Sequence, residues 1–363
     1  MMINKLHMTL QSQQTVFTES QKLAIDYAKA IGIILVLVGH YPNNIMNYFQ
    51  PYIFHMPLFF FIGGMLFNSA KSMRSIINDV VVKYYVYIVA IYLILAFCNI
   101  ALNHLFGTPT RQLFGSGLLD TLEVIANNNF HNNGFFLVGW FLFAFSFVYL
   151  LCSVIIKSVS SFFSTSASVF ILISLILSFI GIHYLANEYQ ATRFFGYNLL
   201  CQIFVGSAFY MMGYVFKRAI FNFGNILTLS ILLLLYITLS DLGMISPLGM
   251  AWSLYPKGYV VAMLGASLGI MIIFSLATVF SFAAKSQFFA MIGRNSKSVM
   301  CFHLLVFSLV DCLASSLGIF TIDKTELFTR YMSSYSFAIY MVAGLVVSME
   351  IGKFMTKITR GVL

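Results

Sequence analysis

The sequence has few charged residues and few cysteines. Asp, Glu, Lys and Arg make up only 9% of its 363 residues, against about 25% in ordinary soluble domains. Such a chain cannot cover a water-facing surface, which excludes a soluble enzyme and a disordered protein. The five cysteines stand singly in apolar stretches, without the spacing of metal sites or disulfide-rich domains. We expect them to be small buried hydrophobic residues, and we predict no metal site and no resident cofactor.

Long apolar runs are abundant instead, because 60% of the residues are hydrophobic. A helix of about 20 apolar residues crosses the hydrocarbon core of a bilayer. The sequence offers ten candidate spans: 25–41, 52–69, 82–102, 134–156, 168–185, 198–216, 223–241, 258–281, 298–318 and 334–356. Runs of this length indicate helices, since barrel strands alternate over about 10 residues. We therefore predict an all-α polytopic transmembrane bundle, with one domain over 25–356, a polar cytoplasmic segment 1–24 and a short tail 357–363.

The distribution of basic residues predicts the orientation. If the N-terminus is cytoplasmic, 15 of the 20 Lys and Arg residues fall on the cytoplasmic side and 5 fall outside. This bias follows the positive-inside rule, so both termini are predicted to be cytoplasmic. The rule also accounts for the net charge of +9 without a nucleic-acid partner. We expect membrane lipid to surround the chain.

The first predicted span carries three polar side chains, Asp26, Lys29 and His40. Ionisable groups inside a membrane are costly and are candidates for function. Lys29 and His40 are eleven residues apart, which places them on one helix face, separated by about 16 Å along the axis. The alternative is that Lys29 extends to the interface and His40 only caps the helix.

The second predicted span begins with another histidine, His55, fifteen residues after His40. The short loop between them can bring the two imidazoles close together. The glycine pair 63–64 allows another backbone to approach closely. Lys71 and Arg74 then follow beside the predicted inner surface. They are either ordinary positive-inside residues or a clamp for phosphate groups.

Two blocks of sequence carry a family resemblance. DYAKAIGIILVLVGH at 26–40 and FHMPLFFFIGGMLF at 54–67 resemble the opening of the integral-membrane acyltransferase family 3. The resemblance continues with GWFL at 139–142 and with IGRNS at 292–296, which leads to His303. Members of this family include bacterial O-acetyltransferases of surface polysaccharides.

The resemblance implies an O-acyltransferase of the bacterial cytoplasmic (inner) membrane. Its donor would be acetyl-CoA, a co-substrate, and its acceptor a sugar hydroxyl of a surface polysaccharide such as an O-antigen, or of its lipid-linked precursor. Lys29 and His40 match the basic residue and histidine of the family pattern, with lysine where many relatives have arginine. Lys71 and Arg74 match its basic pair for acyl-CoA phosphates, and Lys29 and Arg294 are further candidates for acyl-CoA binding.

We predict His40 to be the general base, because an imidazole titrates near neutral pH, with His55 as a second catalytic group. Trp140 also fits a packing role, and His303 also fits a bond to a backbone carbonyl. The candidate residues of the cavity are Asp26, Asn43, Asn44, Trp140, Asn295, Ser296 and His303. We expect the loops 103–133, 186–197, 242–257 and 319–333 to choose the acceptor. A transporter or flippase of a lipid-linked saccharide is the alternative function, because it too would need polar groups within a bundle.

Overall fold

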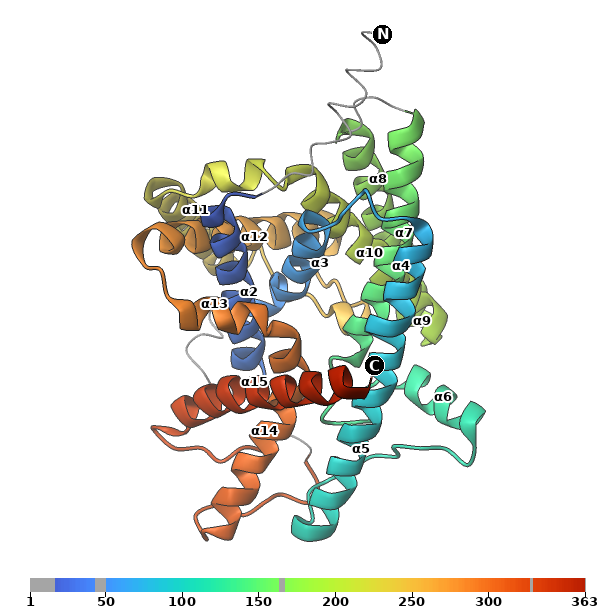
Figure 1. Ribbon diagram of the computed structural model, residues 1–363, viewed down its shortest axis with the longest axis vertical. Helices are drawn as coiled ribbons and strands as arrows, with labels where there is room; N and C mark the ends of the chain where they lie inside the picture. The colour runs from blue at the N-terminus through green and yellow to red at the C-terminus, as the bar shows by residue number, and fades with distance from the viewer. Residues whose placement is uncertain (1–16, 43–49, 163–166, 327–328, 363) are drawn as a thin grey trace.

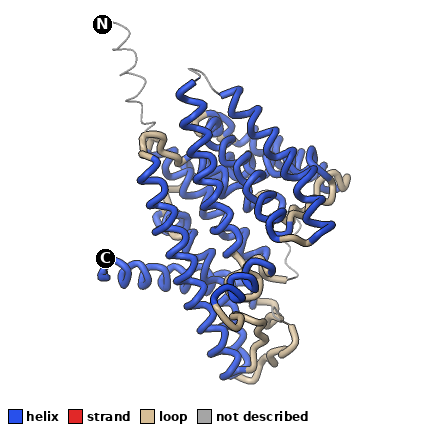
Figure 2. Tube along the Cα trace, turned by 90° about the vertical axis from the view of Figure 1, so that its right-hand side faces the viewer, coloured by secondary structure: helices blue, strands red, loops and turns tan. Residues whose placement is uncertain are grey.

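The computed structural model describes residues 17–42, 50–162, 167–326 and 329–362. These residues form helices joined by loops, and they contain no strand beyond one isolated bridge between Gly249 and Leu254. Figure 2 shows this helical architecture. The predicted all-α class is therefore confirmed for the described part of the chain.

Helices α2 (Glu19–Gly39) and α3 (His55–Met65) lie side by side at the centre of the molecule (Figure 1). A reciprocal cap starts α2, in which Gln21 N–H donates to Thr18 Oγ1 at 3.2 Å and Thr18 N–H donates to Gln21 Oε1 at 3.0 Å. This capping box satisfies two donors that a helix start otherwise leaves free. A 3₁₀ turn at Pro51–Ile53 precedes α3.

The other helices surround this central pair. They are α4 (Met73–Val80), α5 (Tyr87–Phe106), α6 (Leu118–Asn127), α7 (Gly139–Phe162), α8 (Ala167–Phe179), α9 (Ala186–Thr192), α10 (Phe195–Phe216), α11 (Ile226–Asp241), α12 (Gly258–Ala283), α13 (Gln287–Arg294), α14 (Ser296–Ser316) and α15 (Ser336–Val362). Within the described residues, seven helical segments are long and apolar enough to cross a membrane: 73–106, 139–161, 167–192, 195–216, 258–283, 296–316 and 336–355.

Three of the ten predicted spans correspond to helices outside that set. Helix α2 carries four charged residues in its first half, while α3 has 11 residues and α11 has 16. At about 1.5 Å per residue, α3 is roughly half as long as the hydrocarbon core is thick. The predicted span 52–69 was thus too long at both ends. All ten predicted spans fall on helices, but the count of ten and the orientation stay predictions.

Close backbone contacts hold α3 against α10. A β-carbon on Gly64 would lie 1.7 Å from the carbonyl oxygen of Tyr210, and one on Gly213 would lie 1.9 Å from that of Phe61. No side chain fits in these gaps, so the two backbones touch directly. The close approach expected at the glycine pair 63–64 is confirmed.

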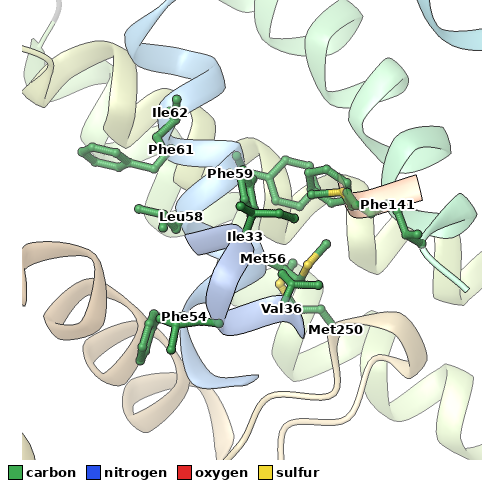
Figure 3. Packing of buried hydrophobic residues seen from close by; sticks show 14 of the residues in the cluster. Ile33, Val36, Phe54, Met56, Leu58, Phe59, Phe61, Ile62, Phe141 and Met250 are labelled. Carbon is green, nitrogen blue, oxygen red and sulfur yellow. The ribbon is translucent and has the colours of Figure 1, made fainter. Parts of the chain in front are cut away.

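Helix α2 is packed on several sides, by α12, α13, α14 and α15 as well as α3. Figure 3 shows Ile33 of α2 beside Phe59 of α3, with Phe141 of α7 beyond them. At the other end of α2, Gly293 of α13 lies against the backbone of Asp26, where a β-carbon would be 1.8 Å from the carbonyl oxygen. Helix α14 runs beside α15. This packing fixes α2, which carries most of the predicted first-span residues, relative to α13 and α14.

Candidate active site

His40 lies at the C-terminal end of α2. Its backbone N–H donates to the carbonyl of Leu37 at 3.0 Å, which closes the last turn. Pro42 follows two residues later, and proline disfavours helical geometry at the residue before it. The chain therefore leaves the helix at His40, and its half-buried imidazole faces neighbouring elements from a helix end.

His303 of α14 is the ring that the structure brings against His40. The two ring centroids are 5.1 Å apart, with the ring planes inclined by 43°. His303 is only 1% exposed, and its Nδ1 lies 3.0 Å from the carbonyl of Val299 and 2.9 Å from that of Met300. A carbonyl oxygen can only accept, so Nδ1 carries the hydrogen. His303 therefore makes the backbone contact and also lies beside His40.

The second ring nitrogen of His303 has no partner. Nε2 is buried and makes no hydrogen bond within the described segments. In the neutral tautomer assigned above, Nε2 is an acceptor. A buried acceptor without a partner is costly, and it is ready to receive a hydrogen bond from a substrate or from a protonated neighbour.

His55 is nearby but is held separately. Its Nδ1 lies 2.6 Å from the carbonyl of Pro51, and its ring meets that of Tyr52 edge-on at 5.0 Å. The Tyr52 hydroxyl donates to the carbonyl of Gly39 at 2.9 Å, which ties the start of α3 to the end of α2. Through Tyr52, His55 is thus linked to the residue that precedes His40. The expectation that the short loop brings the two imidazoles close together stays a prediction, because residues 43–49 of that loop lie outside the described residues.

An ion pair that the sequence analysis missed adjoins the histidines. Arg330 Nη1 and Asp311 Oδ2 are 2.7 Å apart, and their side chains are 2% and 6% exposed. The other oxygen of Asp311 accepts from the Tyr340 hydroxyl and, at 3.1 Å, from the backbone N–H of Tyr331. Asp311 was detectable, because it is a charged residue inside the predicted span 298–318. The sequence did not single out Arg330, because this residue lies in a loop and not within a predicted span.

Arg330 is linked to the histidine pair through Phe307. Its guanidinium lies 5.6 Å from the Phe307 ring centroid, and Phe307 meets His303 edge-on at 5.8 Å. The structure thus brings His40, His303 and Arg330 from three separate parts of the chain into one polar group.

The opposite end of α2 carries a cluster of ionic side chains. Lys29 Nζ lies 3.3 Å from Asp26 Oδ1, and Arg294 Nε lies 3.7 Å from Asp26 Oδ2. The backbone contact between Gly293 and α2 brings Arg294 to this position. Asp26, Lys29 and Arg294 therefore belong together, at the end of α2 away from His40. The carboxylate of Asp26 belongs to this cluster and not to the histidine group.

A second basic cluster is centred on Asp79. Lys71 and Lys83 both form ion pairs with Asp79, the latter at 2.7 Å. Lys297 Nζ donates to the carbonyl of Lys83 at 2.9 Å and lies 3.5 Å from the ring centroid of Tyr87. Because Lys297 follows Arg294 by three residues, the junction of α13 and α14 contributes a cation to each cluster.

Arg74 is exposed on α4, and no ion pair of its side chain is present in the described part of the chain.

Asn295 and Ser296 form the junction of α13 and α14, where Asn295 Nδ2 donates to the carbonyl of Met291 at 2.8 Å. They lie next to Arg294 in the chain and about 10 Å along α14 from His303. The structure therefore places Asn295 and Ser296 with the basic residues, away from the histidine pair.

Trp140 is buried and meets Phe141 edge-on at 6.0 Å, which agrees with a packing role. Asn43 and Asn44 lie outside the described residues. Over those residues, no group of three or more His, Cys, Asp or Glu side chains has the arrangement of a metal site.

Comparison with known proteins gives one match. A family model described as an acyltransferase domain, of acyltransferase family 3, matches residues 22–352. No curated protein and no solved structure matches the chain. The matched range contains all the candidate residues described above.

Proposed function

The chain belongs to acyltransferase family 3, whose model spans residues 22–352, and from this premise we propose that it is a membrane O-acetyltransferase. It transfers the acetyl group of acetyl-CoA to a sugar hydroxyl of a surface polysaccharide, such as an O-antigen, or of its lipid-linked precursor. It acts in the bacterial inner membrane. Membership of an acyltransferase family favours this reaction over the transport of a lipid-linked saccharide.

The contact between His40 and His303 carries the proposal. Attack by a hydroxyl on a thioester needs a base positioned for the hydroxyl proton. His40 is half-buried at a helix end, with an adjacent imidazole whose Nε2 is an unpartnered acceptor. An acceptor beside the base suits a group that must take up and release a proton in every turnover.

The reaction then proceeds by direct transfer. His40 accepts the proton of the sugar hydroxyl while the hydroxyl oxygen bonds to the acetyl carbonyl carbon. The carbon–sulfur bond breaks, and the coenzyme A thiolate takes the proton from the His40 imidazolium. The products are the O-acetyl ester and the free thiol of coenzyme A. His303 stabilises the imidazolium through its acceptor Nε2.

The two basic clusters suit the phosphates of the donor. Arg294 and Lys29 lie in one cluster, and Lys71, Lys83 and Lys297 lie in the other. Arg and Lys side chains bind phosphate oxygens by charge-assisted hydrogen bonds. About 16 Å separates Lys29 from His40 along α2, so the extended pantetheine arm would run beside α2 toward the histidines.

Analysis of the O-acetyl ester on surface glycans by NMR tests the proposal. We compare the wild type, a deletion strain, His40→Ala and the matched control His183→Ala, which removes an exposed histidine away from the site. The glycan should persist in all strains, while the ester is lost from the deletion and His40→Ala strains alone. Loss of the glycan itself on deletion would favour the transporter. An ester retained in His40→Ala at normal protein level would show that His40 is not the base.

A further inference from the structure

Two adjoining pockets open between the loop that follows α5 and the loop that follows α14. Both helices end at the lower end of the molecule in Figure 1. Gly107 ends α5 in the left-handed region, at φ 68°, and Lys324 of the second loop lies against it. A β-carbon at Gly107 would be 3.1 Å from Lys324 Cε, so the two loops are in contact. The pockets lie on either side of Pro109.

The outer pocket is large and polar. Its volume is about 630 Å³, and it is lined by Asn103, Pro109, Thr110, Arg111, Lys324, Thr325 and Glu326. Within the described segments, no ion pair neutralises Arg111, Lys324 or Glu326. Amide, hydroxyl, cationic and carboxylate groups together match the many donors and acceptors of a saccharide. The volume is within the range of ligand pockets in proteins.

The inner pocket is small and continues from the outer one. It shares Pro109 and Glu326 with the outer pocket and extends to Asp311 and Arg330. Its volume of about 20 Å³ accommodates one group the size of a water molecule. That is the size of a hydroxyl group and far smaller than a sugar ring.

A hydroxyl group without a hydrogen-bond partner lines the inner pocket. Thr108 is 7% exposed, and its Oγ1 is buried without a hydrogen-bond partner among the described residues. Buried polar atoms without a partner are rare and each needs an explanation. A hydroxyl that enters the pocket from outside would supply the missing partner.

The inner pocket ends at Arg330, which forms part of its wall. The guanidinium lies 5.6 Å from the centroid of the Phe307 ring, and that ring meets His303 edge-on, so one aromatic ring lies between the pocket and the histidine pair. The basic clusters lie at the opposite end of α2. The two ends of the site thus differ in chemistry, with cations at one and a mixed polar pocket at the other.

We propose that the outer pocket binds the saccharide acceptor and that the inner pocket directs its reacting hydroxyl past Thr108 and Arg330 toward His40 and His303. This assignment rests on the proposed acetyltransferase function. It places acceptor and donor at opposite ends of α2, so that the two substrates approach the histidines from opposite sides.

The test fills or alters the pockets without changing the donor side. Thr110→Trp and Lys324→Trp fill the outer pocket from opposite walls. Thr108→Val removes the unpartnered hydroxyl and keeps the side chain nearly the same shape. Leu317→Trp is the matched control, because Leu317 is exposed at the end of α14, outside the loops expected to choose the acceptor, and does not line either pocket. We measure the O-acetyl ester on cell-surface glycans, and the binding of acetyl-CoA to the purified full chain in lipid nanodiscs.

We expect Thr110→Trp and Lys324→Trp to lower the ester at least tenfold and Thr108→Val to lower it severalfold, with unchanged affinity for acetyl-CoA. Leu317→Trp should behave as the wild type. A normal ester level in both tryptophan variants would overturn the assignment, and so would a parallel loss of acetyl-CoA binding. If the wild type makes no ester beyond that of the deletion strain, the proposed function itself fails, which is a distinguishable result.

Discussion

The imidazoles of His40 and His303 lie 5.1 Å apart, although they come from the first and the next-to-last long helix of the described chain. The backbone carbonyls near Nδ1 fix the hydrogen of His303 on that nitrogen. The buried Nε2 then has no hydrogen-bond partner in the described residues. In the proposed reaction, this pairing makes His303 a positioning residue for His40, and it gives the first prediction.

Replacement of His303 by phenylalanine should strongly lower acetyl transfer while the fold is kept. The ring volume is retained, and the carbonyls of Val299 and Met300 keep their place in the α14 helix. We expect His303→Phe to lower acetyl transfer about 10²-fold, within the range for acid–base groups. Glycan ester analysis at matched protein level measures this effect. Wild-type ester in His303→Phe would contradict a role for the second imidazole.

Removal of one partner of the buried ion pair between Asp311 and Arg330 should strongly lower the stability of the protein. Asp311→Ala removes the carboxylate that pairs with the buried guanidinium of Arg330, and breaking a buried ion pair in this way costs about 3–5 kcal/mol. The double variant Asp311→Leu with Arg330→Met removes both charges, so it should regain part of that stability. Thermal unfolding of the purified protein in detergent measures both.

The exposed pair of Glu19 and Lys22, at 2.6 Å, is the matched control for this experiment. Glu19→Ala should cost about 0–1 kcal/mol, because exposed ion pairs contribute little. Equal effects of Asp311→Ala and Glu19→Ala would show that the buried pair is no more important than a surface pair.

A single methyl group added at Gly64 should disrupt the contact of α3 with α10. A β-carbon on Gly64 would lie 1.7 Å from the Tyr210 carbonyl oxygen, so Gly64→Ala forces the helices apart. We expect a destabilisation of at least about 1–3 kcal/mol, typical of overpacking, measured as the unfolding temperature and the yield of folded protein. Gly117→Ala is the control, because a β-carbon there meets nothing within 4 Å. Equal behaviour of the two variants would contradict the close packing.

Neutralising the basic clusters should weaken donor binding. Arg294→Gln and Lys71→Gln each remove a cation near the predicted phosphates, so KM for acetyl-CoA should rise about tenfold with little change in kcat, as expected for a lost binding contact. Lys353→Gln, which removes an exposed lysine paired with Glu350 at 2.6 Å, is the control. A fall in kcat at constant KM would place these cations in the chemical step instead.

The predicted orientation can be tested with single cysteines. Gln112→Cys should react with a membrane-impermeant maleimide in intact spheroplasts, while Lys285→Cys should react only after permeabilisation. Both positions are exposed. Four of the five native cysteines are buried and Cys98 is partly buried, so the parent chain should show low background labelling. The reverse pattern of labelling would invert the topology.

Much of the architecture followed from the sequence alone. The scarcity of charge and the long apolar runs predicted a helical membrane protein, since these properties are local and need no tertiary information. The same holds for the close backbone contact at Gly64, which the glycine pair predicted. The motifs around His40 and His55 predicted the family. The length of α3 was overestimated, because apolar composition continues on both sides of the helix and does not mark its ends.

Only the tertiary structure decided which polar residues meet. His303 and Arg330 reach His40 from α14 and from a distant loop, and Asp26 pairs with Arg294 rather than with the histidines. Such contacts depend on how helices cross, which spacing along one helix cannot specify. The sequence by itself thus determined what kind of protein this is and which end of α2 holds the histidine. The packing of α13 and α14 on α2 determined the composition of the site, because interiors close-pack in one arrangement and leave few polar groups within reach of each other.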